Sequence, residues 1–358
     1  MTTAILNEYL MKRKQLKLIR ILSSSEGLVD FASTDYFGFA RSLELLESRM
    51  DRIGSTGSRL LTGNHPRFEE LEEKIARFHQ AESCLLYNTG YTANLGLIAA
   101  LGSIEPTFIY DLDIHVSMID GICLSKAKSF AFRHNDLNSL EWRLKGAKPP
   151  IFVIVESIYS VSGDFAPLKE LVGLCLRYGA ELIVDEAHAT GVCGKDGRGC
   201  VSEWGLEEQV FARMHSFSKT LGSHGGCILG SQALKDYLIN FSRPFIYTVA
   251  MPLSALSLIE AGYEKLAREA HVHQQQLRDL VSYFQKRLGI TGPQGPIQPI
   301  WINGVEEARS LSEKLRNEGF DVRALLPPTV KRGKECLRIV VHSFNQEEEI
   351  DRLAEALK

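Results

Sequence analysis

Five short apolar runs, separated by segments long enough to form helices, most constrain the fold of this chain. They occupy residues 83–87, 107–110, 151–155, 181–184 and 227–230. Strands that are apolar throughout are buried on both faces, and the helices that connect parallel strands provide this cover. Between residues 68 and 80, apolar side chains recur every three or four positions among charged ones, which predicts a helix on the outside of the core. The sequence therefore predicts an α/β fold with a mostly parallel central sheet.

The sequence changes character after Tyr247 and predicts a second, smaller domain. A long helical pattern from 252 to 287 is followed by a stretch rich in glycine and proline between residues 289 and 299. Apolar and amphipathic segments then alternate from 298 to 357, as in a compact α+β domain. A chain of 358 residues is also longer than one core normally supports. We therefore expect an N-terminal segment at 1–45, a large domain at 46–255 and a small C-terminal domain at 256–358.

Composition excludes several classes of partner. The 41 basic and 44 acidic side chains leave a net charge of −3, which gives no field that would attract nucleic acid or an anionic membrane surface. No stretch reaches the roughly 18 unbroken apolar residues of a membrane span. The seven cysteines include no C-x-x-C pair, which favours a reducing compartment without disulfides. We expect a cytoplasmic protein that binds neither nucleic acid nor membrane.

The first twenty residues are basic and raise the question of a targeting signal. No apolar core segment or small-residue cleavage site follows them, so a short amphipathic helix is expected. A mitochondrial presequence is the alternative, which Glu8 and the scarcity of serine before Ser23 disfavour.

Two charged residues follow strands in a way that is typical of a ligand site. Asp185 comes directly after the 181–184 run, and ligands of an open parallel sheet bind at the carboxyl ends of its strands. An acid there can pair with a protonated ring nitrogen, and His188 can face the same pocket. Lys219 lies about one helix and one strand further on, beside Ser216, and a lysine sheltered from water is nucleophilic toward an aldehyde. Taken singly, Asp185 could instead be a helix cap and Lys219 a solvated loop residue.

A strand end followed by a helix start offers a phosphate site at Thr89, Gly90 and Tyr91. The unpaired N–H groups and the positive dipole end of a helix attract a phosphate. Hydroxyls at Ser216 and Ser218 could add to this site. An ordinary capped turn is the simpler explanation of the segment when it is taken by itself.

His115 also follows a strand, and a flat imidazole there could stack on the ring of an aromatic cofactor. Metal binding is an alternative use of this region, for which the possible ligands are Asp111, Asp113, His115, Asp185 and His188. Metal-site spacings such as H-E-x-x-H are missing from the sequence, so no metal is predicted. The segment 156–164 closes another core strand and points polar side chains into the same crevice.

Taken together, these residues resemble the α-oxoamine synthase family of fold-type-I pyridoxal-phosphate enzymes, from about Asp30 to the C-terminus. Residues 33–38 look like the family's S-N-D-Y-L-G. Residues 54–59 look like its G-S-G-G-S-R, with Thr56 in place of a glycine, and residues 134–136 repeat its H-N-D. The resemblance implies pyridoxal 5'-phosphate as cofactor, a large domain with a mostly parallel sheet beside a smaller α+β domain, and a homodimer with its active site at the subunit interface.

The resemblance also implies roles for individual residues. Lys219 would bind the cofactor aldehyde and act as the base, and Asp185 would charge the pyridine ring. His188 would reach the ring hydroxyl, while His115 would stack on the ring. Arg338 would grip the carboxylate of the amino acid, a task that suits a planar guanidinium, although a surface strand residue is the simpler explanation from the sequence alone. The further cofactor-binding residues are Thr89, Gly90, Tyr91, Ser160, Ser216 and Thr248, the last of these reaching into the neighbouring subunit.

The implied reaction joins an amino acid to an acyl thioester, with loss of carbon dioxide and formation of an α-amino ketone. The runs at 245–248 and 218–225 look most like members that join L-alanine to a pimeloyl thioester of coenzyme A or a carrier protein in biotin synthesis. Glycine C-acetyltransferase, 5-aminolevulinate synthase and serine palmitoyltransferase share nearly every residue named above and stay open. An aminotransferase or β-eliminating lyase on the same fold, and a binding protein without catalysis, are more distant alternatives.

Overall fold

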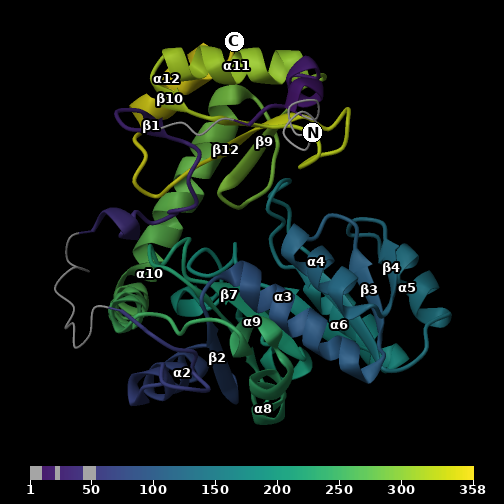
Figure 1. Cartoon of the computed structure of the whole chain (residues 1–358). Helices are drawn as coiled ribbons and strands as arrows, with labels where there is room; N and C mark the ends of the chain where they lie inside the picture. Colours follow the sequence, from purple (N-terminus) through teal and green to yellow (C-terminus); the bar gives the residue numbers. More distant parts are fainter. Residues whose placement is uncertain (1–9, 21–24, 43–53) are drawn as a thin grey trace. The chain divides into compact units, whose positions relative to one another are not determined.

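The computed structural model describes residues 10–20, 25–42 and 54–358, and the fold is given for these residues (Figure 1). Three details of the sequence predictions lie outside them: the N-terminal helix before residue 10, the serine at position 23 and the domain junction at residues 45 and 46. Within the described part, residues 10–15 are helical. The helices within these three ranges do not include one that is both long enough and apolar enough to cross a membrane.

The chain divides into two compact units. We call Asp35–Ser160 with Asp164–Gln276 the central unit, and Met1–Thr34 with Val161–Gly163 and Leu277–Lys358 the terminal unit. Helix α10 (Leu253–Leu288) contributes residues to both. The domain boundary predicted after residue 255 falls inside this helix.

A seven-stranded sheet forms the middle of the central unit. Its strands are β2 (Ser83–Tyr87), β3 (Thr107–Asp111), β4 (Lys128–Phe132), β5 (Ile151–Glu156), β6 (Glu181–Asp185), β7 (Ala212–Ser216) and β8 (Gly226–Gly230). Across the sheet the order is β2-β8-β7-β6-β5-β3-β4, and β8 is antiparallel to both of its neighbours. The prediction of a mostly parallel sheet is confirmed, because all five predicted runs form strands and the remaining pairs are parallel.

Strands β4 and β7 were not among the five predicted runs, and their side chains explain why. Strand β7 carries Arg213 and His215, both buried, so its sequence is not apolar. The carboxylate of Glu186 lies near the Arg213 guanidinium, and His215 Nδ1 lies 2.8 Å from Thr190 Oγ1. Strand β4 lies at an edge of the sheet, and Phe132 is its only buried side chain, so its sequence is not apolar throughout. Burial of partnered polar groups therefore hides β7 from a search for apolar runs.

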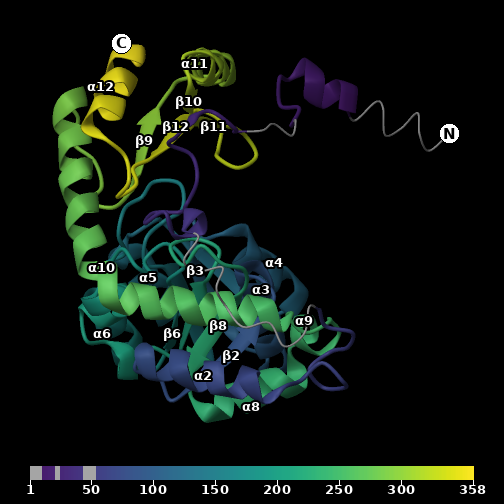
Figure 2. The same cartoon turned by 90° about the vertical axis from the view of Figure 1, so that its left-hand side faces the viewer.

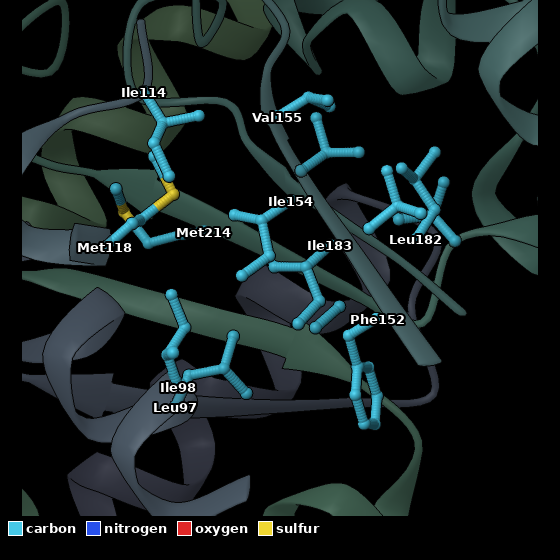
Figure 3. Close-up of a cluster of buried hydrophobic side chains, with 14 of the residues drawn as sticks. Leu97, Ile98, Ile114, Met118, Phe152, Ile154, Val155, Leu182, Ile183 and Met214 are labelled. Carbon is cyan, nitrogen blue, oxygen red and sulfur yellow. The ribbon is translucent and has the colours of Figure 1, made fainter. Parts of the chain in front are cut away.

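Helices cover the sheet, and the helix predicted at 68–80 is α2 (Pro66–Phe78), which packs against β2 (Figure 2). The core side chains labelled in Figure 3 include Leu97, Ile154 and Ile183, from a helix and two neighbouring strands. Each fully buried side chain of this size contributes roughly 1.5–3 kcal/mol. The other helices of the central unit are α3 (Gly90–Leu101), α4 (Val116–Ser125), α5 (Leu137–Lys145), α6 (Leu168–Tyr178), α7 (Cys200–Glu203), α8 (Gln232–Phe241) and α9 (Arg243–Ile246).

The terminal unit is built on a three-stranded antiparallel sheet in the order β11 (Arg323–Leu325), β12 (Cys336–Val340), β9 (Ile297–Trp301). With helices α11 (Val305–Asn317) and α12 (Glu347–Ala356), it is the predicted smaller α+β domain. The sequence did not predict strand β1 (Val29–Asp30), which pairs in parallel with β10 (Phe320–Asp321). This pairing places N-terminal residues in the same unit as the C-terminus.

The core generates a stability prediction. Ile154 on β5 has no exposed surface, so Ile154→Ala should leave a cavity and destabilise the central unit by about 2–5 kcal/mol. Leu176→Ala is the matched control, because 64% of Leu176 is exposed, and it should change stability by about 0.5 kcal/mol or less. Urea unfolding followed by circular dichroism measures both. Equal shifts for the two variants would contradict the assigned core.

Candidate active site

A cavity of about 220 Å³ lies where β5, β6 and β7 of the central unit end. The last residue of each strand, Glu156, Asp185 and Ser216, lines it. The structure brings together most of the predicted site residues here, namely Thr89, Gly90, Tyr91, His115, Asp185, His188, Ser216 and Lys219. Ser218, suggested above as a further hydroxyl for the phosphate, and Glu156, from the segment 156–164, also line it. The cavity includes four residues without a predicted role: Asn94, Ser117, Ala187 and Met214.

Ser160, Thr248 and Arg338 were predicted as site residues but are not among those that line this cavity. The backbone N–H of Ser160 donates to Oε2 of the lining residue Glu156 at 3.0 Å. Thr248 Oγ1 accepts a hydrogen bond from Asn88 Nδ2 at 3.2 Å. Arg338 lies on β12 in the terminal unit. The roles of these three residues stay predictions.

Asp185 is a carboxylate at the end of a buried strand, with 5% of its surface exposed. Each oxygen accepts a hydrogen bond from an N–H group: Oδ2 from Asn94 Nδ2 and Oδ1 from Ala187 N, both at 2.8 Å. Such bonds satisfy a buried acceptor and fix the plane of the carboxylate. The side chain is therefore oriented before any ligand arrives.

His115 is the N-cap of α4, and its Nδ1 accepts from Ser117 N at 3.3 Å. The hydroxyl of Ser117 lies 2.7 Å from the same nitrogen. Burial lowers the pKa of His115, as does the positive charge of Lys219, although Asp185 and Asp120 oppose this. A neutral imidazole ring therefore lies in the wall of the cavity.

Glu156 lies beside Asp185 in the parallel register of β5 and β6, and 2% of its surface is exposed. Burial, and then the negative charge of Asp185, raise the pKa of Glu156 well above its usual value. Lys219 and the backbone N–H groups of Ser160 and His115 oppose this shift. The arrangement places two buried acidic side chains next to each other.

The start of α3 can hold a phosphate. Thr89 caps the helix: its side chain accepts from Thr92 N at 3.0 Å, and the first intrahelical bond runs from Ala93 N to Thr89 O. The N–H groups of Gly90 and Tyr91 precede that bond and belong to the unpaired donors of a helix start. A Cβ at Gly90 would lie 3.3 Å from both Cβ and Oγ of Ser216, so glycine lets the two walls approach.

Lys219 lies in a tight turn after β7. Gly222 N donates to Lys219 O, and Phe217 N donates to Gly225 O, both at 2.9 Å. Gly222 has a φ of +60°, and a Cβ there would lie 2.3 Å from the backbone nitrogen of Ala40. Glycine at this position therefore lets the turn pack against the chain itself.

Sequence reasoning missed several polar residues of the site. Asn94 donates to Asp185 and Ser117, and Tyr36 OH lies 2.6 Å from His188 Nδ1. Asn94 did carry a signal, because it is a polar residue in the apolar part of α3. The Tyr36 contact joins residues far apart in the sequence, and no local pattern predicts it.

Asp111, one of the two carboxylates before His115, contacts a histidine. His134 lies between Asp111 and Asp164, with Nδ1 at 2.9 Å from Asp111 Oδ1 and Nε2 at 2.8 Å from Asp164 Oδ2. Asn135 N donates to the other oxygen of Asp111 at 2.8 Å. Among the described residues, no group of three or more His, Cys, Asp or Glu side chains is arranged to hold a metal ion.

The site residues fit pyridoxal phosphate. Asp185 offers an oriented anion for a protonated ring nitrogen, Lys219 an amine for the aldehyde and the start of α3 a set of N–H groups for the phosphate. The flat ring of His115 lies in the same cavity. Together with the mostly parallel sheet, this donor set defines a fold-type-I pyridoxal-phosphate enzyme.

Comparison with known proteins agrees with this class. The model of the family "Aminotransferase class I and II" matches residues 26–357. An 8-amino-7-oxononanoate synthase of Emericella nidulans is 37% identical over 385 residues, which cover 97% of this chain and 93% of that protein. The chain therefore belongs to the aminotransferase class I and II family.

Solved structures show the same fold. Serine palmitoyltransferase of Sphingomonas wittichii is 28% identical with a TM-score of 0.84, over 92% of this chain and 86% of that chain. The 8-amino-7-oxononanoate synthase of Francisella tularensis is 25% identical with a TM-score of 0.78, over 93% of this chain and 97% of that chain. Both likenesses span nearly the whole molecule.

The His134 contacts generate a pH prediction. Partial burial alone would lower its pKa, but the hydrogen bonds to Asp111 and Asp164 raise the pKa of His134 to about 10. The value in an unfolded chain is about 6.5. Because the folded-state value is higher, this stabilisation is complete below about pH 6.5 and is lost as the pH rises toward 10.

His134→Gln should therefore lower the unfolding temperature by a few degrees near pH 6, and the gap to the unchanged protein should narrow toward pH 10. Thermal unfolding across this pH range measures the gap. Arg133→Gln is a neighbouring control, since that side chain is exposed. A gap that stays constant over the whole range would show that His134 is not held as a cation.

Proposed function

We propose that this chain is an 8-amino-7-oxononanoate synthase, a pyridoxal-phosphate-dependent C-acyltransferase that condenses L-alanine with a pimeloyl thioester. The thiol and carbon dioxide leave, and an α-amino ketone forms. The observation that carries the proposal is the donor set of Lys219, Asp185 and His115 in one cavity. The full-length relatives that bear this name support it.

When bound, pyridoxal phosphate supplies the electron sink that makes the Cα–H bond of an amino acid acidic. Asp185, with its plane fixed by Asn94 and Ala187, would keep the ring nitrogen protonated. The N–H groups of Gly90 and Tyr91 would bind the phosphate at the start of α3. These contacts would set the ring in one orientation.

Lys219 would hold the cofactor between turnovers and then act as the base. Its Nζ would accept the proton from the substrate Cα once the amino acid has displaced it. The ring of His115 would cover the cofactor face and keep water away from this proton transfer. His188, which Tyr36 holds through its Nδ1, would contact the ring hydroxyl. Ser160 and Ser216 would complete the contacts to the cofactor.

We also propose a homodimer in which Thr248 reaches the phosphate bound by the neighbouring subunit. Large apolar side chains are exposed on either side of Thr248: Tyr247 is 74% and Val249 50% exposed. Leu61, which follows the motif at residues 54–59, is 81% exposed. Contiguous exposed apolar surface marks protein interfaces, and Tyr247 and Val249 are near neighbours in the chain. The predicted cytoplasmic location rests on composition and stays a prediction.

An assay of amino acids against acyl thioesters tests the proposed reaction. The protein is supplied with pyridoxal phosphate, and release of the free thiol is followed with alanine, glycine or serine. Alanine with pimeloyl-CoA or a pimeloyl carrier protein should give the highest kcat/KM, and Lys219→Ala should lower it at least about 1,000-fold, since it removes the base. Turnover of glycine with acetyl-CoA, or of serine with palmitoyl-CoA, but not of alanine would contradict the proposal.

Arg338 provides a second test. If its guanidinium binds the substrate carboxylate through paired hydrogen bonds, Arg338→Lys should raise the KM for alanine roughly 10- to 100-fold while the KM for the thioester stays the same. Arg332→Lys is the matched control, because Arg332 is an exposed loop residue of the same unit. Equal KM values for both variants would remove Arg338 from the substrate site.

A further inference from the structure

A continuous chain of hydrogen bonds links Asp185 to His115. Asn94 Nδ2 donates to Asp185 Oδ2 at 2.8 Å and to Ser117 Oγ at 3.1 Å. Ser117 Oγ in turn lies 2.7 Å from His115 Nδ1. Asn94 is 1% exposed and Ser117 is fully buried, so bulk water does not compete for these bonds. The chain joins the residue proposed to charge the cofactor ring to the residue proposed to cover it.

The direction of each bond follows from which groups can donate. Both Asp185 oxygens accept from N–H groups, so the amide of Asn94 must turn its nitrogen, not its oxygen, toward the carboxylate. That orientation leaves Asn94 Oδ1 buried with no hydrogen-bond partner in the described part of the chain. A buried acceptor without a partner costs free energy, so this orientation must be stabilised by the bonds that the amide nitrogen makes. The charge of Asp185 therefore determines the orientation of Asn94.

The bond between Ser117 and His115 also has a direction. The second hydrogen of Asn94 Nδ2 points at Ser117 Oγ, so the hydroxyl hydrogen of Ser117 must be directed elsewhere. The other partner of this oxygen is His115 Nδ1. The backbone N–H of Ser117 donates to the same nitrogen from 3.3 Å, so Nδ1 is an acceptor and carries no proton of its own. The hydroxyl of Ser117 is then its second donor.

We propose that Asn94 and Ser117 are positioning residues that hold His115 as the neutral tautomer with its proton on Nε2, under the control of the Asp185 charge. These hydrogen bonds are made between side chains of this protein and do not depend on the proposed function. Their value for catalysis rests on the proposed function. A neutral ring suits that function, because an imidazolium stacked on a cofactor with a protonated ring nitrogen would place two like charges face to face.

The charged groups around His115 do not by themselves determine this tautomer. Asp185 of β6 and Asp120 of α4 favour a protonated imidazole, whereas burial and Lys219, in the turn after β7, favour a neutral one. Glu156 at the end of β5 is a further acidic side chain of this cavity, and burial raises its pKa. None of these groups selects between Nδ1 and Nε2. The backbone N–H of Ser117 does, because a proton on Nδ1 would face this donor and would force the hydroxyl of Ser117 to turn its own hydrogen away.

Nitrogen NMR of the histidine-labelled protein, measured before and after addition of pyridoxal phosphate, tests the proposal without any substrate. The signals of His115 are those missing from His115→Asn. They should show an unprotonated Nδ1 and a protonated Nε2 from about pH 6 to pH 8. A proton on Nδ1 in the unchanged protein would overturn the proposal, even if the enzyme made the proposed product. If the expected tautomer is found in a protein that does not condense alanine with a pimeloyl thioester, only the proposed function is contradicted.

Variants then test the two positioning residues. Ser117→Ala removes the hydroxyl donor, so the pKa of His115 should rise by roughly one unit or its signals should show a mixture of tautomers. Ser117→Thr keeps the hydroxyl and should restore the original signals. In Asn94→Asp the new carboxylate can only accept a hydrogen bond from the hydroxyl of Ser117. The oxygen of Ser117 then has no hydrogen for His115, so His115 Nδ1 should gain a proton. Asn94→Ala adds no charge and should give a mixture of the two His115 tautomers. Unchanged His115 signals in Ser117→Ala and Asn94→Ala would refute their role.

Discussion

The site depends on a buried carboxylate and on the N–H groups that hold it. Asp185 ends a strand inside the central unit, where an unpartnered charge would cost several kcal/mol. Its two donors come from the chain just after β6 and from helix α3, so the carboxylate ties that helix to the sheet. The same helix starts with the N–H groups proposed to bind the phosphate. This polar contact thus links the two ends of the proposed cofactor site.

The sequence predicted the sheet well because most of its strands are apolar along their whole length. It failed where burial is reached by pairing polar groups, as for Arg213 and His215 on β7. It also failed for β1, whose partner β10 lies almost at the other end of the chain. Such pairing depends on tertiary structure, and a pattern read over a few residues does not contain it.

For the site, the sequence indicated the strand ends and therefore the residues that stand there. Asp185, Ser216, His115 and Lys219 do line one cavity. Asn94 and Ser117 were missed as functional candidates, because their importance lies in which way their hydrogens point. Gly222 likewise packs closely against Ala40, a contact that its position in the sequence does not indicate. Residue type alone does not show which partner a side chain or a glycine has in the fold.

The most direct test of the account is to locate the covalent link between protein and cofactor. The protein is mixed with pyridoxal phosphate and reduced with borohydride, which converts an imine into a stable amine, and its peptides are analysed by mass spectrometry. The account predicts one phosphopyridoxyl group per chain, on Lys219, and its loss in Lys219→Ala. A label spread over exposed lysines, or no label on Lys219, would contradict it.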